Sequence, residues 1–275
     1  MSSLSIAHSI ILGVVEGITE FLPISSTGHL IVTERILKLA STDSLDAYTV
    51  IIQIGAIAAV LGLYRRRIGE ILQGLIGKSV TGRRLLIALI VAFLPAGLVG
   101  FALNKKIDAH LLNPTTVAVA WIVGGALLLY LAPRLRPSRK GAALESLTLR
   151  QAGIIGVAQV LSLIPGTSRS LVTIVAAVLV GLSISAAVEF SFLLGLITLT
   201  AATAYKLLKD GGTVFNDYGT TAPIVGIVVA GISAFIAVRT FVSFLRNRSL
   251  SGFGYYRIGV GILTLILLGT NAIAR

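Results

Sequence analysis

Two acidic residues, Glu16 and Glu20, lie four positions apart inside an apolar stretch near the start of the chain. This spacing puts both carboxylates on one face of a helix. Pro23 then interrupts the helix, and a run of short polar side chains and a histidine follows: Ser25, Ser26, Thr27 and His29. Carboxylates beside hydroxyls and an imidazole are groups that can bind a metal ion, attack an electrophile or transfer protons.

The composition around these groups is that of a membrane protein. Of the 275 residues, 55% are hydrophobic and 12% are charged, and the mean hydropathy is +0.95. Such values are typical of polytopic helical membrane proteins, in which buried ionisable side chains are costly and therefore point to function. The absence of cysteine excludes thiol chemistry. The net charge of +12 fits basic loops beside anionic lipid headgroups, and we predict no nucleic-acid partner.

Apolar segments of two lengths follow one another along the chain. Six are long enough to span a membrane: 47–64, 85–103, 115–132, 186–208, 222–245 and 255–274. Shorter stretches occur as two pairs, 5–22 with 24–39 and 149–164 with 171–182, each broken at a proline. Because each short stretch is too short for a full crossing, we predict that each pair is a re-entrant helix–turn–helix, which enters and leaves on one side.

The order of these pieces repeats. Residues 13–23 (GVVEGITEFLP) align with residues 156–165 (GVAQVLSLIP), and the turn sequences ISSTG and GTSRS then coincide. Each repeat contributes three full spans, an odd number, so the second repeat must be inverted in the membrane. The sequence thus predicts one all-α polytopic membrane domain of two inverted-topology repeats. The repeats lie at about 5–132 and 148–274, with a basic linker at 133–147, and their hairpin turns meet near the membrane centre.

Charge predicts the orientation. Basic residues gather in the loops 65–84, 133–150 and 245–257, the last of which is taken to include Arg257. By the positive-inside rule these loops are cytoplasmic, so both termini lie outside and the first hairpin dips in from the outer face. Glu189 and Arg239 lie in apolar spans. We expect them to be structural, either paired with each other or supporting the site.

The second turn supplies Thr167, Ser168, Arg169 and Ser170. Serines and threonines that begin helices expose backbone N–H groups to anions, and Arg169 offers a planar fork for phosphate oxygens. Two glutamates in a low dielectric need a cation, and a divalent metal shared with phosphate fits that need. The residues therefore predict a phosphate ester site. Ser26 or a metal-bound water is the nucleophile, and His29 is the proton partner.

Each group also has a purely structural interpretation. Glu16 and Glu20 can be protonated helix–helix hydrogen bonders, the serines and threonines can be N-caps, His29 can be a packed side chain, and Arg169 can extend to the surface. Ionisable pairs inside a membrane are usually functional. The repeat places Arg169 at a turn facing the first one, which favours the functional interpretation.

The residues EGITEFLPISSTGHL, followed later by PGTSRS, closely resemble the two signature motifs of the undecaprenyl-pyrophosphate phosphatases of the bacitracin-resistance type. The resemblance covers most of the chain. It implies removal of one phosphate from the C55 isoprenyl diphosphate carrier at the outer face of the bacterial inner membrane. This reaction would recycle the carrier for peptidoglycan synthesis, and so serve cell-wall biogenesis and cell shape, and it would confer bacitracin resistance.

The resemblance also implies roles for particular residues. The first catalytic motif of the family is matched by Glu16, Glu20, Ser26, Thr27 and His29, and the second by Ser168 and Arg169. The family is similar in needing a divalent cation, Mg²⁺ or Ca²⁺, for which Glu16 and Glu20 are the expected ligands. Together with the residue-level argument, the expected substrate-binding set is Ser25, Thr27, Thr167, Ser168, Arg169 and Ser170. The oligomeric state stays open, and a homodimer is one option.

A transporter is the alternative from another class. Inverted repeats with broken helices at the midplane are also the architecture of secondary transporters, so a polyprenyl-phosphate flippase would fit the same pattern. The dense hydroxyl and histidine run beside two acids is more than headgroup binding requires. The second repeat carries Gln159 and Leu163 in place of Glu16 and Glu20, and this asymmetry favours an enzyme that is open to the outer face.

Overall fold

The computed structural model describes residues 4–135, 141–245 and 248–273, which are mainly helical and contain no β-strand. The first half contains α1 (Ile6–Thr19), α2 (Ser26–Ile36), α3 (Asp43–Leu63), α4 (Arg65–Leu75), α5 (Val80–Leu111) and α6 (Pro114–Leu131). The short 3₁₀ helices η1 (Ala132–Arg134) and η2 (Leu144–Ser146) lie in the connection to the second half, and η3 (Val160–Leu163) lies within that half. Its α-helices are α7 (Leu149–Gln159), α8 (Arg169–Leu179), α9 (Ile184–Tyr218), α10 (Thr221–Leu245) and α11 (Ser251–Gly269).

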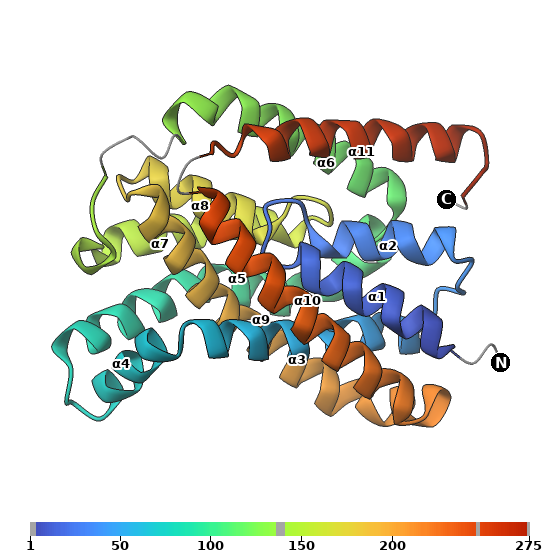
Figure 1. Cartoon of the computed structure of the whole chain (residues 1–275), viewed down its shortest axis with the longest axis horizontal. Helices are drawn as coiled ribbons and strands as arrows, with labels where there is room; N and C mark the ends of the chain where they lie inside the picture. The colour runs from blue at the N-terminus through green and yellow to red at the C-terminus, as the bar shows by residue number, and fades with distance from the viewer. Residues whose placement is uncertain (1–3, 136–140, 246–247, 274–275) are drawn as a thin grey trace.

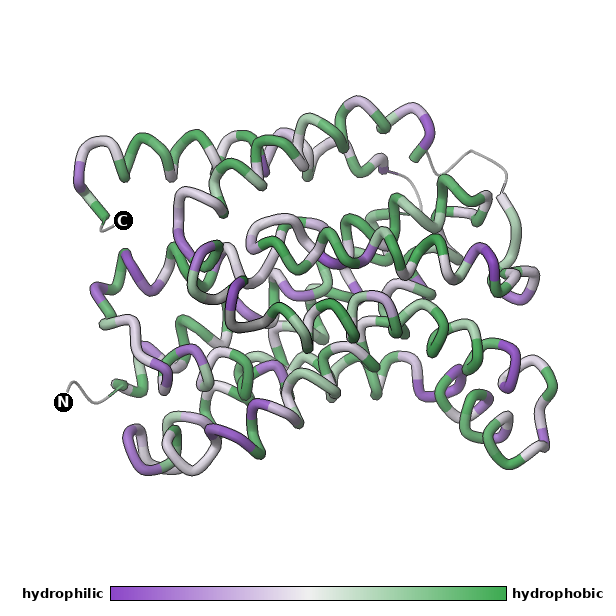
Figure 2. The backbone as a smooth tube through the Cα atoms, turned by 180° about the vertical axis from the view of Figure 1, so that it is seen from behind, coloured by the Kyte–Doolittle hydropathy of each residue, from purple (hydrophilic) through white to green (hydrophobic). Residues whose placement is uncertain are grey.

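Within the described residues, six helices are long and apolar enough to cross a membrane: α3, α5, α6, α9, α10 and α11. Each overlaps one of the six spans predicted from the sequence. Their outer surfaces expose large apolar side chains such as Leu98, Phe101 and Ile266, and Figure 2 shows the long helices as mainly hydrophobic tubes. Such a surface is unfavourable in water but matches lipid tails. The prediction of an all-α, multi-pass membrane protein is confirmed.

One helix was missed. The basic residues predict a loop at 65–84, but residues 65–75 form α4. Ile68, Ile71, Leu72 and Leu75 recur at helical spacing opposite polar positions, and this is the signature of an amphipathic helix. Leu72 and Leu75 stay exposed on its surface. The arginines at the start of this segment favoured a loop, and the helical spacing of the apolar residues was therefore overlooked.

The helices pack in a pattern that relates the two halves of the chain. In Figure 1, α6 and α11 lie side by side along one edge of the molecule, and α1 packs along α10. In the same way, α7 of the second half packs along α5 of the first. Both contacts are close because of a glycine: an added Cβ would lie 2.8 Å from the Gly226 carbonyl oxygen at Gly13 and 2.5 Å from the Ala92 carbonyl oxygen at Gly156.

The ends of the molecule differ in composition. In Figure 1 both chain termini lie at one end of the long axis, whereas α4 and the segment after α6 lie at the other end. Arg65 and Arg66 are exposed there. The basic residues Arg136, Arg139 and Lys140 of the linker, and Arg246, fall outside the described residues. Where it is described, the basic end is thus opposite the termini.

Arg67 joins three parts of the chain at this basic end. Its guanidinium donates to Glu70 at 2.8 Å, to Glu145 at 2.9 Å and to Glu189 of α9 at 2.7 Å. Glu189 therefore pairs with Arg67, and the expected pairing with Arg239 is wrong, since Arg239 is exposed on α10. The three carboxylates raise the pKa of Arg67. The pKa of Glu145 is lowered by its own backbone N–H and by Arg67.

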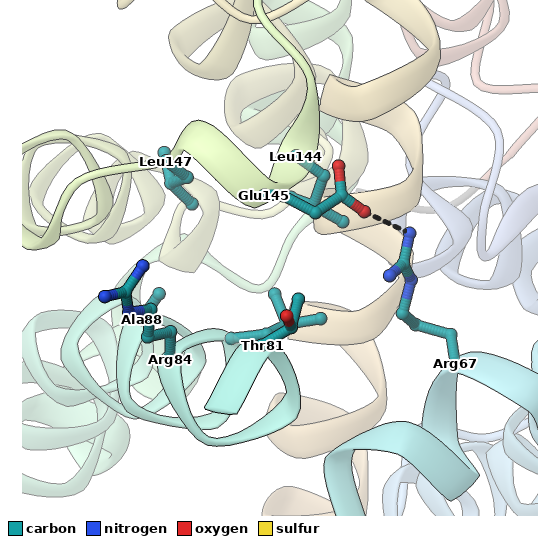
Figure 3. Close-up of a pocket in the computed structure, with 8 residues that line it drawn as sticks. Arg67, Thr81, Arg84, Ala88, Leu144, Glu145 and Leu147 are labelled. Carbon is teal, nitrogen blue, oxygen red and sulfur yellow. Dashed lines mark hydrogen bonds and ion pairs between the residues drawn. The ribbon is translucent and has the colours of Figure 1, made fainter. Parts of the chain in front are cut away.

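A small pocket of about 130 Å³ lies beside this network. Figure 3 shows Glu145 and Arg67 joined on one side of it, with Thr81 and Arg84 across the opening. None of the residues predicted for the phosphate site lines this pocket. The pocket is part of the junction between α4, α5 and η2.

We predict that the Arg67 network stabilises this end of the fold. Replacing Arg67 with glutamine removes three ion pairs that are only partly shielded from solvent, so we expect a loss of about 1–2 kcal/mol in the free energy of unfolding. Thermal unfolding of the purified variant in detergent measures this loss. Arg66→Gln, which removes the same charge from an exposed position, is the control.

The pH dependence has a definite sign. Because the pKa of Glu145 is lowered in the folded protein, its contribution is present at neutral pH and is lost as the pH falls through that lowered value. The difference in melting temperature between wild type and Arg67→Gln should therefore become smaller in acid. A gap that stays constant on acidification, or equal melting of Arg67→Gln and Arg66→Gln, would contradict this assignment.

Candidate active site

Two turns with the same backbone geometry form the centre of the site. Helix α2 is capped by Ser25, with φ 72° and ψ 103°, whose hydroxyl accepts from the Gly28 N–H at 3.4 Å. Helix α8 is capped by Ser168, with φ 75° and ψ 112°, whose hydroxyl accepts from the Leu171 N–H at 3.3 Å. A positive φ is uncommon for serine, and strained backbone of this kind persists where the surroundings enforce it. The turns are thus counterparts in the two halves.

Glu20 connects the two turns. It is the C-cap of α1, and its side chain is 6% exposed. One carboxylate oxygen accepts a hydrogen bond from the hydroxyl of Ser26, the first residue of α2. The other oxygen accepts from Nη2 of Arg169 at 3.0 Å. Three groups therefore meet at one buried point: the Ser26 hydroxyl, the Glu20 carboxylate and the Arg169 guanidinium. Arg169 lies about 150 positions after Glu20 in the chain.

The Arg169 side chain is fixed on several sides. Nη1 donates to the Ser191 carbonyl oxygen of α9 at 3.2 Å, and the guanidinium carbon lies 5.7 Å from the centroid of the Phe21 ring. A Cβ at Gly195 would overlap the guanidinium, so the absence of a side chain there makes room for it. With a side chain only 10% exposed, Arg169 does not extend to the surface. It is held as a rigid, permanently charged fork.

Ser170 fastens the second turn to the first. Its hydroxyl donates to the Leu22 carbonyl oxygen at 2.8 Å and lies 3.1 Å from the hydroxyl of Ser168. Both serines are buried. Their bonds satisfy polar groups that a low-dielectric interior would otherwise leave unpaired. Ser170 thus joins the two turns, and Ser168 bonds within the second turn.

Glu16 lies one helical turn before Glu20 and is fully buried, and neither of its carboxylate oxygens has a hydrogen-bond partner. Carboxylate oxygens are the ligands that Mg²⁺ and Ca²⁺ prefer, so the unpartnered oxygens of Glu16 suit a divalent cation. Glu20 can add the lone pairs that its bonds to Ser26 and Arg169 leave free. The described residues contain no cluster of three or more histidine, cysteine, aspartate or glutamate side chains that could hold one. Further ligands would therefore come from substrate or water.

His29 makes contacts away from Ser26. Its Nδ1 lies 2.6 Å from the Ser25 carbonyl oxygen, and its Nε2 lies 2.8 Å from the hydroxyl of Tyr256 on α11. Because a carbonyl oxygen only accepts, Nδ1 carries the hydrogen, and Nε2 of the neutral ring accepts from Tyr256. The rings of His29 and Tyr256 are stacked, with an interplanar angle of 6°. The hydrogen bond of Ser26 goes to Glu20 instead.

Two expected substrate contacts lie at the margin of this cluster. Thr27 is exposed on the first turn of α2, and Thr167 is half-buried before Ser168. Neither side chain joins the hydrogen bonds between the turns. The structure thus brings together Glu16, Glu20, Ser26, Ser168, Arg169 and Ser170, and it leaves the two threonines accessible.

Three residues beside the turns were not singled out from the sequence. Trp121 of α6 donates its indole N–H to the Ile24 carbonyl oxygen at 2.7 Å, and Tyr256 bonds His29. Arg257, which was counted among the loop cations, is fully buried in α11, so that assignment is wrong. The signal was present, because Arg257 already falls inside the apolar stretch 255–274.

The fold and the site together define a polytopic helical membrane protein in which a carboxylate, a hydroxyl and an arginine meet between two helix-capping turns. The family profile described as bacitracin resistance protein BacA matches residues 9–263. This chain belongs to that family.

Curated relatives match almost end to end. The undecaprenyl-diphosphatase of Methylococcus capsulatus is 46% identical over 258 residues, which cover 94% of this chain and 93% of the relative. Undecaprenyl-diphosphatase 1 of Chromobacterium violaceum is 44% identical, with 96% and 95% covered. The undecaprenyl-diphosphatase of Aquifex aeolicus is 42% identical, with 93% and 96% covered. The relatives thus match nearly the whole chain, and the family profile includes both turns.

Proposed function

We propose that this chain is an undecaprenyl-diphosphatase, which hydrolyses the C55 isoprenyl diphosphate to the monophosphate and phosphate. The observation that carries the proposal is the meeting of Ser26, Glu20 and Arg169, because it joins a nucleophile, a proton acceptor and a phosphate-binding cation. The names of the relatives support the same activity. Hydrolysis would recycle the lipid carrier for cell-wall synthesis and confer bacitracin resistance.

The geometry supports a mechanism with Ser26 as the nucleophile. Its oxygen forms a bond to the terminal phosphorus, its proton passes to Glu20, and the bond to the bridging oxygen breaks to release the isoprenyl monophosphate. Arg169 and the N–H groups at the start of α8 hold the charged oxygens. Water then hydrolyses phosphoserine, releases phosphate and restores the Ser26 hydroxyl. In the alternative mechanism, water attacks phosphorus directly, and Ser26 only helps to bind the substrate.

The roles of the remaining residues follow from their contacts. The hydrogen bond from Ser26 to Glu20 supports Glu20, rather than His29, as the proton acceptor. His29 orients the Ser25 carbonyl, which belongs to the cap of α2. Thr27 and Thr167, which lie at the margin, are proposed to contact the diphosphate as it enters. Ser25, Ser168 and Ser170 shape the two turns.

A divalent cation, Mg²⁺ or Ca²⁺, is proposed at Glu16 and Glu20. When bound, such an ion neutralises charge on phosphate oxygens. The unpartnered oxygens of Glu16 support this site. We predict that chelation abolishes phosphate release and that Glu16→Gln lowers kcat/KM by at least about 10-fold.

Metal binding itself provides a second measurement for this prediction. Mg²⁺ or Ca²⁺ should raise the melting temperature of wild type but raise that of Glu16→Gln much less. Glu34→Gln, which alters a buried acid of the same hairpin away from the turn, is the control and should behave as wild type. Full activity of Glu16→Gln after chelation would contradict the site.

The membrane arrangement is a second part of the proposal. We infer two inverted repeats, about 5–132 and 148–274, separated by the linker 133–147, in which the short helices of each half form a re-entrant hairpin. The matching caps at Ser25 and Ser168 support this, as do the equivalent packing of α1 on α10 and of α7 on α5. Both turns lie near the middle of the long axis in Figure 1.

The proposed location is the bacterial inner membrane, with the basic end in the cytoplasm and the site open to the outer face. The exposed Arg65 and Arg66, opposite the two termini, support this orientation. The lipid tail would lie along the apolar outer faces of the spans. A headgroup in the turns with its tail in lipid would suit a substrate that never leaves the membrane.

Phosphate release from undecaprenyl diphosphate by purified protein in detergent tests the activity. Detergent removes any compartment, so a transporter has nothing to move, whereas an enzyme still turns over. We expect metal-dependent release of one phosphate per lipid. Binding of the lipid without release would favour the flippase alternative.

A further inference from the structure

Arg257 connects the two turns to the spans around them. It is fully buried in α11. Nη1 donates to the Pro23 carbonyl oxygen in the first turn at 3.3 Å. Nη2 donates to the Gly166 carbonyl oxygen in the second turn at 2.9 Å and to the Ala120 carbonyl oxygen of α6 at 3.0 Å. One side chain thus bonds both halves of the site and a membrane span.

The charge of this guanidinium is not neutralised by a side chain. No acid of the described residues forms an ion pair with Arg257, and its Nε is buried without an acceptor. Arginine stays protonated in proteins, and a buried charge without a counter-ion is costly. Carbonyl oxygens satisfy hydrogen bonds but leave the unit charge. The Arg257 guanidinium therefore leaves a net positive charge in contact with both turns.

The surrounding helices leave room for the guanidinium. A Cβ at Gly124 of α6 would overlap Nη2, and the next nearest atoms are the guanidinium carbon and Nε of Arg257. Gly195 stands in the same relation to Arg169. Arg257 is fully buried and bonded to three carbonyl oxygens, so moving its side chain would break these hydrogen bonds. Each arginine of this region thus occupies a space that a glycine provides.

We propose that Arg257 is a positioning residue for the diphosphatase reaction, which holds the two turns at a fixed separation and supplies positive potential that the diphosphate neutralises. The inference rests on the proposed function. It separates two arginines by role: Arg169 contacts the phosphate, whereas Arg257 acts through the Pro23 and Gly166 carbonyls and through its field. The diphosphate is then the counter-ion that the folded chain lacks.

The charge role is tested with Arg257→Gln, Arg257→Lys and the control Arg248→Gln, which changes an exposed arginine. Calorimetry with inorganic pyrophosphate measures binding without turnover, and phosphate release measures kcat and KM. We expect Arg257→Gln to weaken pyrophosphate binding and raise KM by about 10-fold or more. Arg257→Lys, which keeps the charge but loses the fork, should retain most of the binding while kcat falls about 10-fold.

The positioning role is tested with Gly124→Ala, which displaces the guanidinium without removing it. Gly259→Ala on α11, where an added Cβ meets nothing within 4 Å, is the matched control. We expect kcat of Gly124→Ala to fall about 10-fold relative to Gly259→Ala. If Arg257→Gln does not fold, the comparison of the two glycine variants tests the positioning role. Pyrophosphate binding by Arg257→Lys then tests the charge role.

The outcomes separate this inference from the proposed function. A wild type that binds pyrophosphate but releases no phosphate contradicts the proposed function, and the binding arm still tests Arg257. Unchanged pyrophosphate affinity in folded Arg257→Gln, whatever its melting temperature, overturns the charge role. Equal kcat in the two glycine variants overturns the positioning role. A purely structural residue would lower the melting temperature and leave KM and pyrophosphate affinity as they are.

Discussion

Replacing Arg169 with glutamine is expected to lower kcat/KM for phosphate release by at least about 100-fold, because the charged fork facing the phosphate disappears. Glu20→Gln should cost about as much, because the carboxylate that accepts the Ser26 proton is lost. Steady-state phosphate release measures both. Arg239→Gln, which removes a charge from the exposed face of α10, should retain wild-type activity.

Removing both members of the Glu20–Arg169 ion pair should affect stability and activity differently. Each single variant leaves one buried charge without its partner, a loss of about 3–5 kcal/mol. The double variant Glu20→Gln with Arg169→Gln removes both charges, so its melting temperature should recover towards wild type while its activity stays lost. Activity that recovers together with stability would show that the pair is only structural. Near wild-type activity in both single variants would contradict the site.

Ser26→Ala is expected to lower phosphate release by roughly 10³-fold, because it removes the nucleophile and the hydrogen bond to Glu20. Wild-type protein quenched during turnover should carry phosphate on Ser26, which mass spectrometry of the peptide detects. Ser162→Ala is the control, since this hydroxyl of the second hairpin bonds only the nearby Gln159 carbonyl oxygen.

The alternative course has a different signature. If water attacks phosphorus directly, no phosphoserine accumulates and Ser26→Ala retains measurable turnover, with its loss mainly in KM. Full activity of Ser26→Ala would exclude Ser26 as the nucleophile. Phosphate found on another residue would transfer the role to that residue.

The amino-acid sequence alone determined the class of protein and the identity of most chemical groups. The apolar spans follow from composition, because only long apolar helices satisfy their backbone in lipid. Glu16 and Glu20 share a helix face by local spacing, and Ser25 and Ser168 cap helices by local chemistry. All of these depend on neighbours within a few positions. The same local signals missed α4, because its arginines favoured a loop over the helical spacing of its apolar residues.

The repeat predicted that the two turns meet, but only the tertiary structure decided which side chains pair there. The ion pair of Glu20 with Arg169 joins residues in different halves, and the partner of Ser26 proved to be Glu20, while His29 bonds Tyr256. Arg257 looked like the end of a basic loop, yet it is buried between both turns. Hydrogen bonds and buried charges depend on which helices pack together. That choice is made by close contacts such as α1 on α10, which no local pattern encodes.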